Sequence, residues 1–233
     1  MITVGWTPYK FSHTNSGFDH ELEFIHNVFF EPEKLSNIFN GVKSNFRNCP
    51  ANTQFLKNFW LIRAPFDFEV AFDRKNRRAQ LDKEQKWVNE FFHARWDESS
   101  DNDNLLITHG CRYLFVADEP TRIEVYPPFL HKEVENTRFI NGTFDIQKWQ
   151  RPVDFSFEVL DDTKPVKVKR GDPLFYIKFQ GEDLFEDFKL KEIEWTDELL
   201  RMTKRCQPQV WYKGLGWKLA RLGNRGRPKK LVK

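Results

Sequence analysis

Histidine and cysteine side chains are the first candidates for chemistry in this chain, because they ligate metals and carry protons. His131 and Glu133 have the His-x-Glu spacing that begins the two-histidine, one-carboxylate iron site of many oxygenases. Such a site takes its second histidine from a later strand, and no histidine follows His131 in the sequence. The sequence therefore predicts that His131 is a loop residue after Pro127-Pro128, and that no catalytic metal is bound.

The three cysteines and one histidine are candidates for a zinc site of the Cys₃His type. They are Cys49, Cys111, Cys206 and His109. Structural zinc sites use paired ligands on tight turns, and only His109 and Cys111 are close in sequence. We therefore expect two ordinary buried thiols and a histidine at a polar edge, without metal. The three widely spaced cysteines are typical of free thiols in a reducing cytoplasm.

Other catalytic signatures are missing from the sequence. It holds no G-x-S-x-G nucleophile elbow and no phosphate-binding G-x-x-x-x-G-K-[ST] loop. Carboxylates occur on the expected strands at Asp67, Glu69, Asp145 and Asp154. The solvent-facing side of any sheet carries such residues. Their spacing would also allow ion pairs of Asp67 with Arg63 and of Asp154 with Arg151, but it does not decide whether these pairs form. We predict no enzymatic activity and no cofactor, and an unrecognised carboxylate site in the β-core is the alternative.

Basic and acidic side chains are unevenly divided along the chain. No acidic residue follows Glu198, whereas 11 of the 37 basic residues lie in 201–233. The preceding 200 residues carry 26 basic and 34 acidic side chains, a net charge of −8. An acidic body with a basic arm is typical of a protein whose arm contacts a polyanion. Two alternatives stay open: the arm folds back on the body, or it is only a solvated tail.

The end of the arm, Arg225-Gly226-Arg227-Pro228-Lys229-Lys230, resembles the AT-hook of chromatin proteins. An extended Gly-Arg-Pro core fits a narrow A·T minor groove, with the arginines along its floor and the lysines on phosphates. The partner predicted is nucleic acid, with A·T-rich DNA as the specific target, or an acidic protein. The candidate nucleic-acid contacts are Arg221, Arg225, Arg227, Lys229 and Lys230. Trp211, Tyr212 and Trp217 are candidates for base stacking, although the helical spacing of Trp211 favours core packing.

Composition and periodicity favour a β-rich fold. The 233 residues include 24 Phe and only 2 Met, and period-two alternation recurs along the chain. Asn141-Gly142 predicts a hairpin between its flanking strands. Many short strands with frequent turns indicate an antiparallel β-sandwich or jelly-roll-like core. The expected strands are 59–63, 66–72, 105–109, 112–117, 122–126, 138–140, 143–146, 153–159, 166–168 and 174–179.

The sequence suggests four segments. Residues 1–58 form an irregular or helical N-terminal arm packed on the core, and 1–20 lack any period. Residues 59–190 form the sandwich, with an inserted loop at 73–104 that includes a possible helix near 87–92. Residues 191–222 form C-terminal helices, the first capped by Thr196 or Asp197, and 223–233 are the basic tail. We recognise no signal peptide and no membrane span, so we expect a cytoplasmic protein.

Several strand segments are similar in order and spacing to an uncharacterised family of β-rich proteins from tailed-phage and bacterial genomes. They are FWLIRAPFDFEVAF, RYLFVA, RIEVYPPF, GTFDIQKWQRPVDFSFEV and KRGDPLFYIKF, within about 60–180. The resemblance implies a jelly-roll-like core, a phage origin and a location in the host cytoplasm or the virion, and it implies no activity. It favours host-takeover or virion roles over metabolism, and the acidic insertion and the C-terminal arm depart from the family's shared core. On this basis and on the charge of the arm, the leading hypothesis is a binding protein whose arm contacts nucleic acid. The alternative is a virion or assembly component whose arm docks an acidic protein surface.

Overall fold

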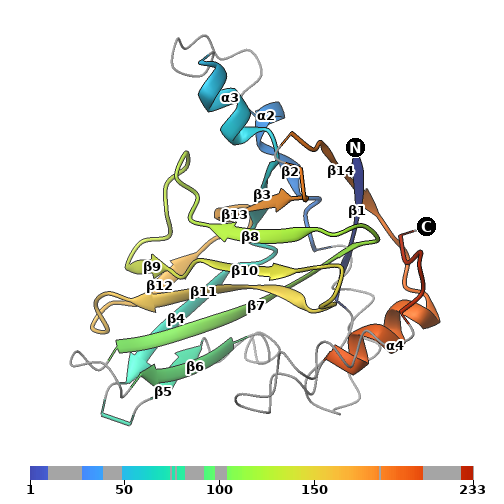
Figure 1. Ribbon diagram of the computed structural model, residues 1–233. Coiled ribbons are helices and arrows are strands. Elements are labelled where there is room, and N and C mark those ends of the chain that lie inside the picture. The colour runs from blue at the N-terminus through green and yellow to red at the C-terminus, as the bar shows by residue number, and fades with distance from the viewer. Residues whose placement is uncertain are drawn as a thin grey trace.

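The computed structural model describes residues 1–9, 28–38, 49–73, 75–76, 78–81, 92–97, 104–183, 185–206 and 227–232. These residues form a mainly β structure with a sandwich-like core and a few short helices, so the predicted fold class is confirmed. The sheets lie in the middle of the molecule, and the labelled helices lie at its ends (Figure 1).

The largest sheet has six strands in the order β14-β1-β7-β11-β9, and β6 also pairs with β7. Its strands are β1 (Ile2–Pro8), β6 (Phe92–Asp97), β7 (Asn104–Ala117), β9 (Thr137–Phe139), β11 (Pro152–Val159) and β14 (Phe188–Glu192). The pairing of β1 with β14 is parallel, and the other pairings in this sheet are antiparallel.

A second sheet has five strands in the order β10-β8-β13-β3-β2, and a third has the order β12-β4-β5. The second contains β2 (Glu33–Lys34), β3 (Phe59–Arg63), β8 (Arg122–Tyr126), β10 (Gly142–Asp145) and β13 (Pro173–Gln180). The third contains β4 (Phe68–Asp73), β5 (Arg78–Leu81) and β12 (Val166–Val168). The structure thereby confirms the strands predicted at 59–63, 122–126, 153–159, 166–168 and 174–179.

Aromatic rings fill the space between the two larger sheets. Phe115 on β7 lies 5.6 Å from Phe179 on β13, measured between ring centroids. Phe155 on β11 stacks at 6.0 Å on Phe175 of β13. All four side chains are buried, so the many Phe residues serve as the interlocking core that the composition predicts.

Within the described residues, three helices cover the outer faces of these sheets. α2 (Leu35–Ile38) and α3 (Pro50–Leu56) place Leu35 and Leu56 against Phe59 of β3. α4 (Asp197–Cys206) packs Leu199 and Met202 on the outward side of β7. The predicted cap of α4 is confirmed, because the N–H of Leu199 donates to Thr196 Oγ1 at 3.2 Å. The second C-terminal helix expected at 211–222 lies outside the described residues.

The prediction of an irregular arm is wrong for residues 2–8, which form β1 inside the largest sheet. β1 lies between two strands and is buried on both faces, so its sequence shows no alternation of apolar and polar residues. Gly5 allows close packing there: a Cβ at this position would lie 2.8 Å from Ile193 Cδ1, so the Ile193 side chain would have to shift. β2 also precedes residue 59, so the sandwich recruits part of the predicted N-terminal arm.

The predicted hairpin at Asn141-Gly142 is also wrong. β9 pairs with β11 in the largest sheet, whereas β10 pairs with β8 in the five-stranded sheet. The chain therefore crosses from one sheet to the other at these residues. Neither residue has a positive φ, which the tight hairpin turn of an Asn-Gly pair requires.

The predicted insertion at 73–104 contains regular structure at both ends. β5 extends the third sheet, and β6 pairs with β7, so these parts are strands rather than loop. Phe92, expected in a helix, begins β6, and residues 82–91 and 98–103 lie outside the described residues. The two strands expected at 105–109 and 112–117 are one strand, β7, with Arg112 at a φ of 54°.

Candidate nucleic-acid interface

Residues 227–232, here called the C-terminal anchor, are bound to the loop that follows β7. The Nη2 of Arg227 donates to the carbonyl oxygen of Ala117 at 2.5 Å and to Asp118 Oδ1 at 3.2 Å. The N–H of Leu231 donates to Asp118 Oδ1 at 2.7 Å, and that of Val232 to Oδ2 at 3.1 Å. One carboxylate therefore holds both ends of the anchor through charge-assisted hydrogen bonds.

Burial strengthens this attachment. The side chains of Arg227 and Asp118 are 11% and 16% exposed, so solvent screens their ion pair only weakly. Gln147 Nε2 donates to the Asp118 carbonyl oxygen at 2.8 Å and so helps to fix the loop that presents the carboxylate. Removing either charge would leave the other mostly buried without its partner.

An apolar contact completes the anchor. Leu231 is 4% exposed and belongs to a cluster on the outward side of β7. The cluster also holds Tyr9, Leu114, Val116, Ile193, Leu199 and Met202. The C-terminus accordingly lies beside β1 and α4 (Figure 1). This end of the basic arm thus folds back on the body, one of the alternatives that the charge division leaves open.

The five candidate nucleic-acid contacts have different positions. Lys229 and Lys230 are exposed on the C-terminal anchor, between its two attachment points. Arg227 is held by Asp118 and Ala117, and its guanidinium is turned to the body. The cations of the anchor that face solvent are therefore the two lysines. The remaining candidates, Arg221 and Arg225, lie outside the described residues, as do Trp211, Tyr212 and Trp217.

The four residues weighed for a zinc site do not come together as one group. His109 Nδ1 is 3.1 Å from Cys111 Sγ, and both side chains are fully buried, so the expected polar-edge position of His109 is wrong. Cys49 is exposed. The thiol of Cys206 donates a hydrogen bond to Gln150 Oε1, with 3.6 Å between Sγ and Oε1. Burial lowers the pKa of His109 to about 3 and raises the pKa of Cys111, which favours a neutral imidazole beside a neutral thiol. Within the described residues, no group of three or more metal-ligating side chains comes together.

His131 lies in the loop between β8 and β9, as predicted. Its Nδ1 is 2.5 Å from the hydroxyl of Tyr176, which also accepts the N–H of Leu130 at 3.3 Å. Burial is the main cause that raises the pKa of Tyr176 to about 12 and that lowers the pKa of His131. A neutral histidine on a neutral tyrosine holds this loop to β13.

The strand carboxylates each have a partner. Asp154 pairs with Arg151 at 2.6 Å, which confirms one of the two ion pairs that spacing leaves open. Arg63 pairs instead with Glu33 at 2.7 Å, and Asp67 accepts the N–H of Arg170 at 2.5 Å. The remaining two carboxylates pair with lysines, Glu69 with Lys167 and Asp145 with Lys148. These contacts join neighbouring strands and turns.

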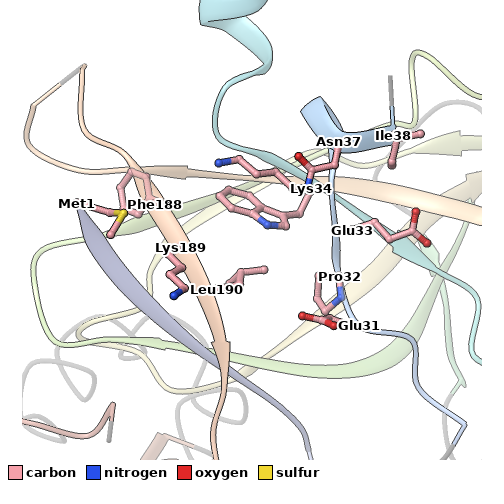
Figure 2. A pocket seen from close by; sticks show the side chains of 11 residues that line it. Met1, Glu31, Pro32, Glu33, Lys34, Asn37, Ile38, Phe188, Lys189 and Leu190 are labelled. Atoms are coloured by element: carbon pink, nitrogen blue, oxygen red, sulfur yellow. The ribbon is translucent and has the colours of Figure 1, made fainter. Parts of the chain in front are cut away.

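Sequence reasoning missed two features. Asp118, the receptor of the C-terminal anchor, is marked only by its place directly after the β7 strand. A groove of about 640 Å³ lies where β2 and α2 approach β14, and residues of all three elements line it (Figure 2). No sequence pattern joins these segments, because they are distant in the chain.

Comparison with protein-family models and with curated protein sequences finds no match to this chain. Of the helices that the structure describes, none has the length and apolar character needed to cross a membrane.

Proposed function

We propose that this protein is a non-enzymatic, phage-type binding protein whose basic C-terminal arm contacts nucleic acid. The observation that carries the proposal is an arm anchored on an acidic body with exposed lysines. Arg227 and Leu231 make the anchoring contacts, and Lys229 and Lys230 are exposed between them. A polyanion would meet these cations at a defined place on the body rather than on a free tail.

The charge of the anchor supports this role. Asp118 is the acidic residue that the anchor contacts, and its charge is offset by Arg227 and two N–H groups. Repulsion of phosphate at this place is therefore reduced, although the body as a whole is acidic. Lysines that neutralise phosphates release counterions, which gives affinity without reading the base sequence.

Recognition of A·T-rich DNA requires a second state of the arm. An AT-hook-like core places both of its arginines in the minor groove, whereas Arg227 donates to Asp118 in the anchored state. We therefore propose that the anchored arm binds phosphates irrespective of sequence. A preference for A·T-rich duplex arises only when Arg227 leaves Asp118 and joins Arg225 on the DNA.

Fluorescence anisotropy with a labelled duplex tests the proposal. Lys229→Gln with Lys230→Gln removes two exposed charges and leaves the contacts of Arg227 and Leu231 in place. Lys75→Gln with Lys169→Gln removes the same charge from exposed lysines elsewhere on the body. We expect about tenfold weaker binding from the first pair and less than twofold from the second. Equal effects of the two pairs would contradict the proposal.

Docking of an acidic protein surface during virion assembly is the alternative, and it would use the same lysines. It predicts that the full-length protein binds no duplex and that a partner captured from the native host survives nuclease treatment. Loss of the captured material on nuclease treatment favours nucleic acid.

A further inference from the structure

The groove between β2 and β14 lies where one edge of each large sheet comes to the same side of the sandwich. β14 is the end strand of the six-stranded sheet, and β2 is the end strand of the five-stranded sheet. Figure 2 shows β14 on one side of the groove and β2 with α2 on the other. Trp60 of β3 also lines the groove. The volume of about 640 Å³ is within the range of ligand sites in proteins.

The main chain of β14 has an edge that no described strand occupies. The N–H of Ile2 donates to the carbonyl oxygen of Asp187, and the N–H of Ile193 donates to that of Trp6. The odd-numbered residues of β14 thus turn their main-chain groups to β1. The N–H and C=O groups of Phe188 and Leu190 point the other way, and among the described strands β14 pairs only with β1.

The groove runs along this edge. Phe188, Lys189 and Leu190 all line it, although consecutive side chains of a strand point to opposite faces. A cavity that touches all three residues follows the edge of the strand rather than one face. Its course along the strand edge and the main-chain donors and acceptors there therefore match an extended peptide better than a compact ligand.

The side chains along the edge define what such a peptide would carry. Phe188 is buried in the core and Leu190 packs against it, whereas Lys189 between them is exposed. Residues of an added strand lie opposite these three and share their faces. Apolar side chains would therefore meet Phe188 and Leu190, and an acidic side chain between them would meet Lys189.

The charged side chains that line the groove bear on the choice of an acidic residue between two apolar ones in the peptide. The ammonium group of Lys34 lies 5.5 Å from the centroid of the Trp60 ring, and in Figure 2 it is on the same side as that of Lys189. Glu33 on the opposite side is held by both Arg63 Nε at 2.7 Å and Nη2 at 3.2 Å, which offsets its charge. Lys34 belongs to β2 and interacts with Asp187, and Glu31 also lines the groove. Lys189 is therefore the group on β14 that favours an acidic side chain opposite it.

We propose that this groove binds an extended segment of a partner protein, which adds to β14 as a further strand and presents an apolar–acidic–apolar sequence. The main chain of Leu190 supplies the central hydrogen bonds. Phe188 and Leu190 contact the two apolar side chains, and Lys189 pairs with the acidic one. This site is separate from the basic arm and does not depend on nucleic-acid binding.

The probe is the peptide Thr-Val-Glu-Val-Thr-amide with fluorescein attached to its N-terminus. Its binding to the full chain is followed by fluorescence anisotropy. Leu190→Pro removes the outward N–H, a change that an edge strand tolerates, and Leu190→Ala is its matched control for the lost side chain. We expect the proline variant to bind at least tenfold more weakly than the alanine variant. Thermal unfolding of both variants checks that each is folded.

Lys189→Glu provides a second, independent readout at an exposed side chain. This variant should bind the peptide with lysine in place of glutamate at least tenfold more tightly than the original peptide, the reverse of the wild-type preference. A peptide N-methylated at the glutamate and at both valines should not bind the wild type, because it lacks the N–H groups that either strand direction requires. Three results would overturn the proposal: no saturable binding of the original peptide, equal affinity of the proline and alanine variants, or an unchanged preference in Lys189→Glu.

Discussion

Arg227 and Asp118 are 109 residues apart in sequence, and their side chains form an ion pair at 3.2 Å. The same carboxylate accepts the N–H groups of Leu231 and Val232. Asp118 therefore acts as a receptor for the end of the chain. Because the pair is largely buried, the C-terminal anchor contributes to the stability of the fold as well as to the position of the lysines.

Asp118→Asn should destabilise the protein. The change keeps the shape of the side chain and removes the charge that Arg227 faces, so the free energy of unfolding should fall by about 3 kcal/mol. Glu182→Gln, at an exposed position, should change it by less than about 0.5 kcal/mol. Urea denaturation measures both values. Equal stability of the two variants would mean that the ion pair does not hold the anchor.

Stability should fall in mild acid because of His109. Its pKa is lowered from 6.5 to about 3, chiefly by burial and then by the charge of Arg112, so between these values the unfolded chain binds a proton that the folded chain does not. The stabilising contribution is complete above pH 6.5 and declines as the pH falls towards 3, by up to about 1.4 kcal/mol per pH unit. Urea denaturation at several pH values measures this slope. His109→Gln should flatten it, and an unchanged slope in that variant would assign the acid sensitivity to other groups.

The aromatic core makes a direct prediction for stability. Phe155 is 1% exposed between the two larger sheets, so Phe155→Ala should lower the free energy of unfolding by about 3–5 kcal/mol. Phe185 is 73% exposed, and Phe185→Ala should have an effect below about 0.5 kcal/mol. Chemical denaturation compares the two variants. A similar loss in both would be inconsistent with the packing of Phe155 on Phe175.

Gly5 should not accept a side chain. Gly5→Ala would bring a Cβ to 2.8 Å from Ile193 Cδ1, and the resulting overpacking should destabilise the fold by about 1–3 kcal/mol. A Cβ added at Gly142 would meet nothing within 4 Å, so Gly142→Ala is the matched control and should be nearly neutral. Melting temperatures of the two variants give the comparison. Equal melting temperatures would argue against the position of β1 in the sheet.

Local patterns predicted those strands that have one face buried and one face wet. β11 alternates buried and half-buried residues along its whole length, and β8 follows the same rule. β1 was not predicted because both of its faces are buried, so its sequence lacks the alternation of apolar and polar residues. Asn141-Gly142 led to a wrong hairpin prediction because the sequence signal for a hairpin is local. The packing of the two sheets decides which strand each flanking segment pairs with.

The candidate site was predictable to a similar extent. The charge division located the basic arm, because it is a property of sequence composition alone. The attachment of Arg227 to Asp118 was not predictable, since no spacing rule joins residues so distant in the chain. The groove beside β14 depends on two sheet edges that only the assembled sandwich brings together.

The salt dependence of duplex binding tests the central claim most directly. If Lys229 and Lys230 each neutralise a phosphate, replacing both with Gln should make the slope of log K against log[salt] shallower by about 1.8. The matched Lys75→Gln, Lys169→Gln protein should keep the wild-type slope. Anisotropy titrations at several salt concentrations give these slopes. The account predicts a shallower slope only for the anchor variant, and a slope identical to that of the wild type in this variant would contradict it.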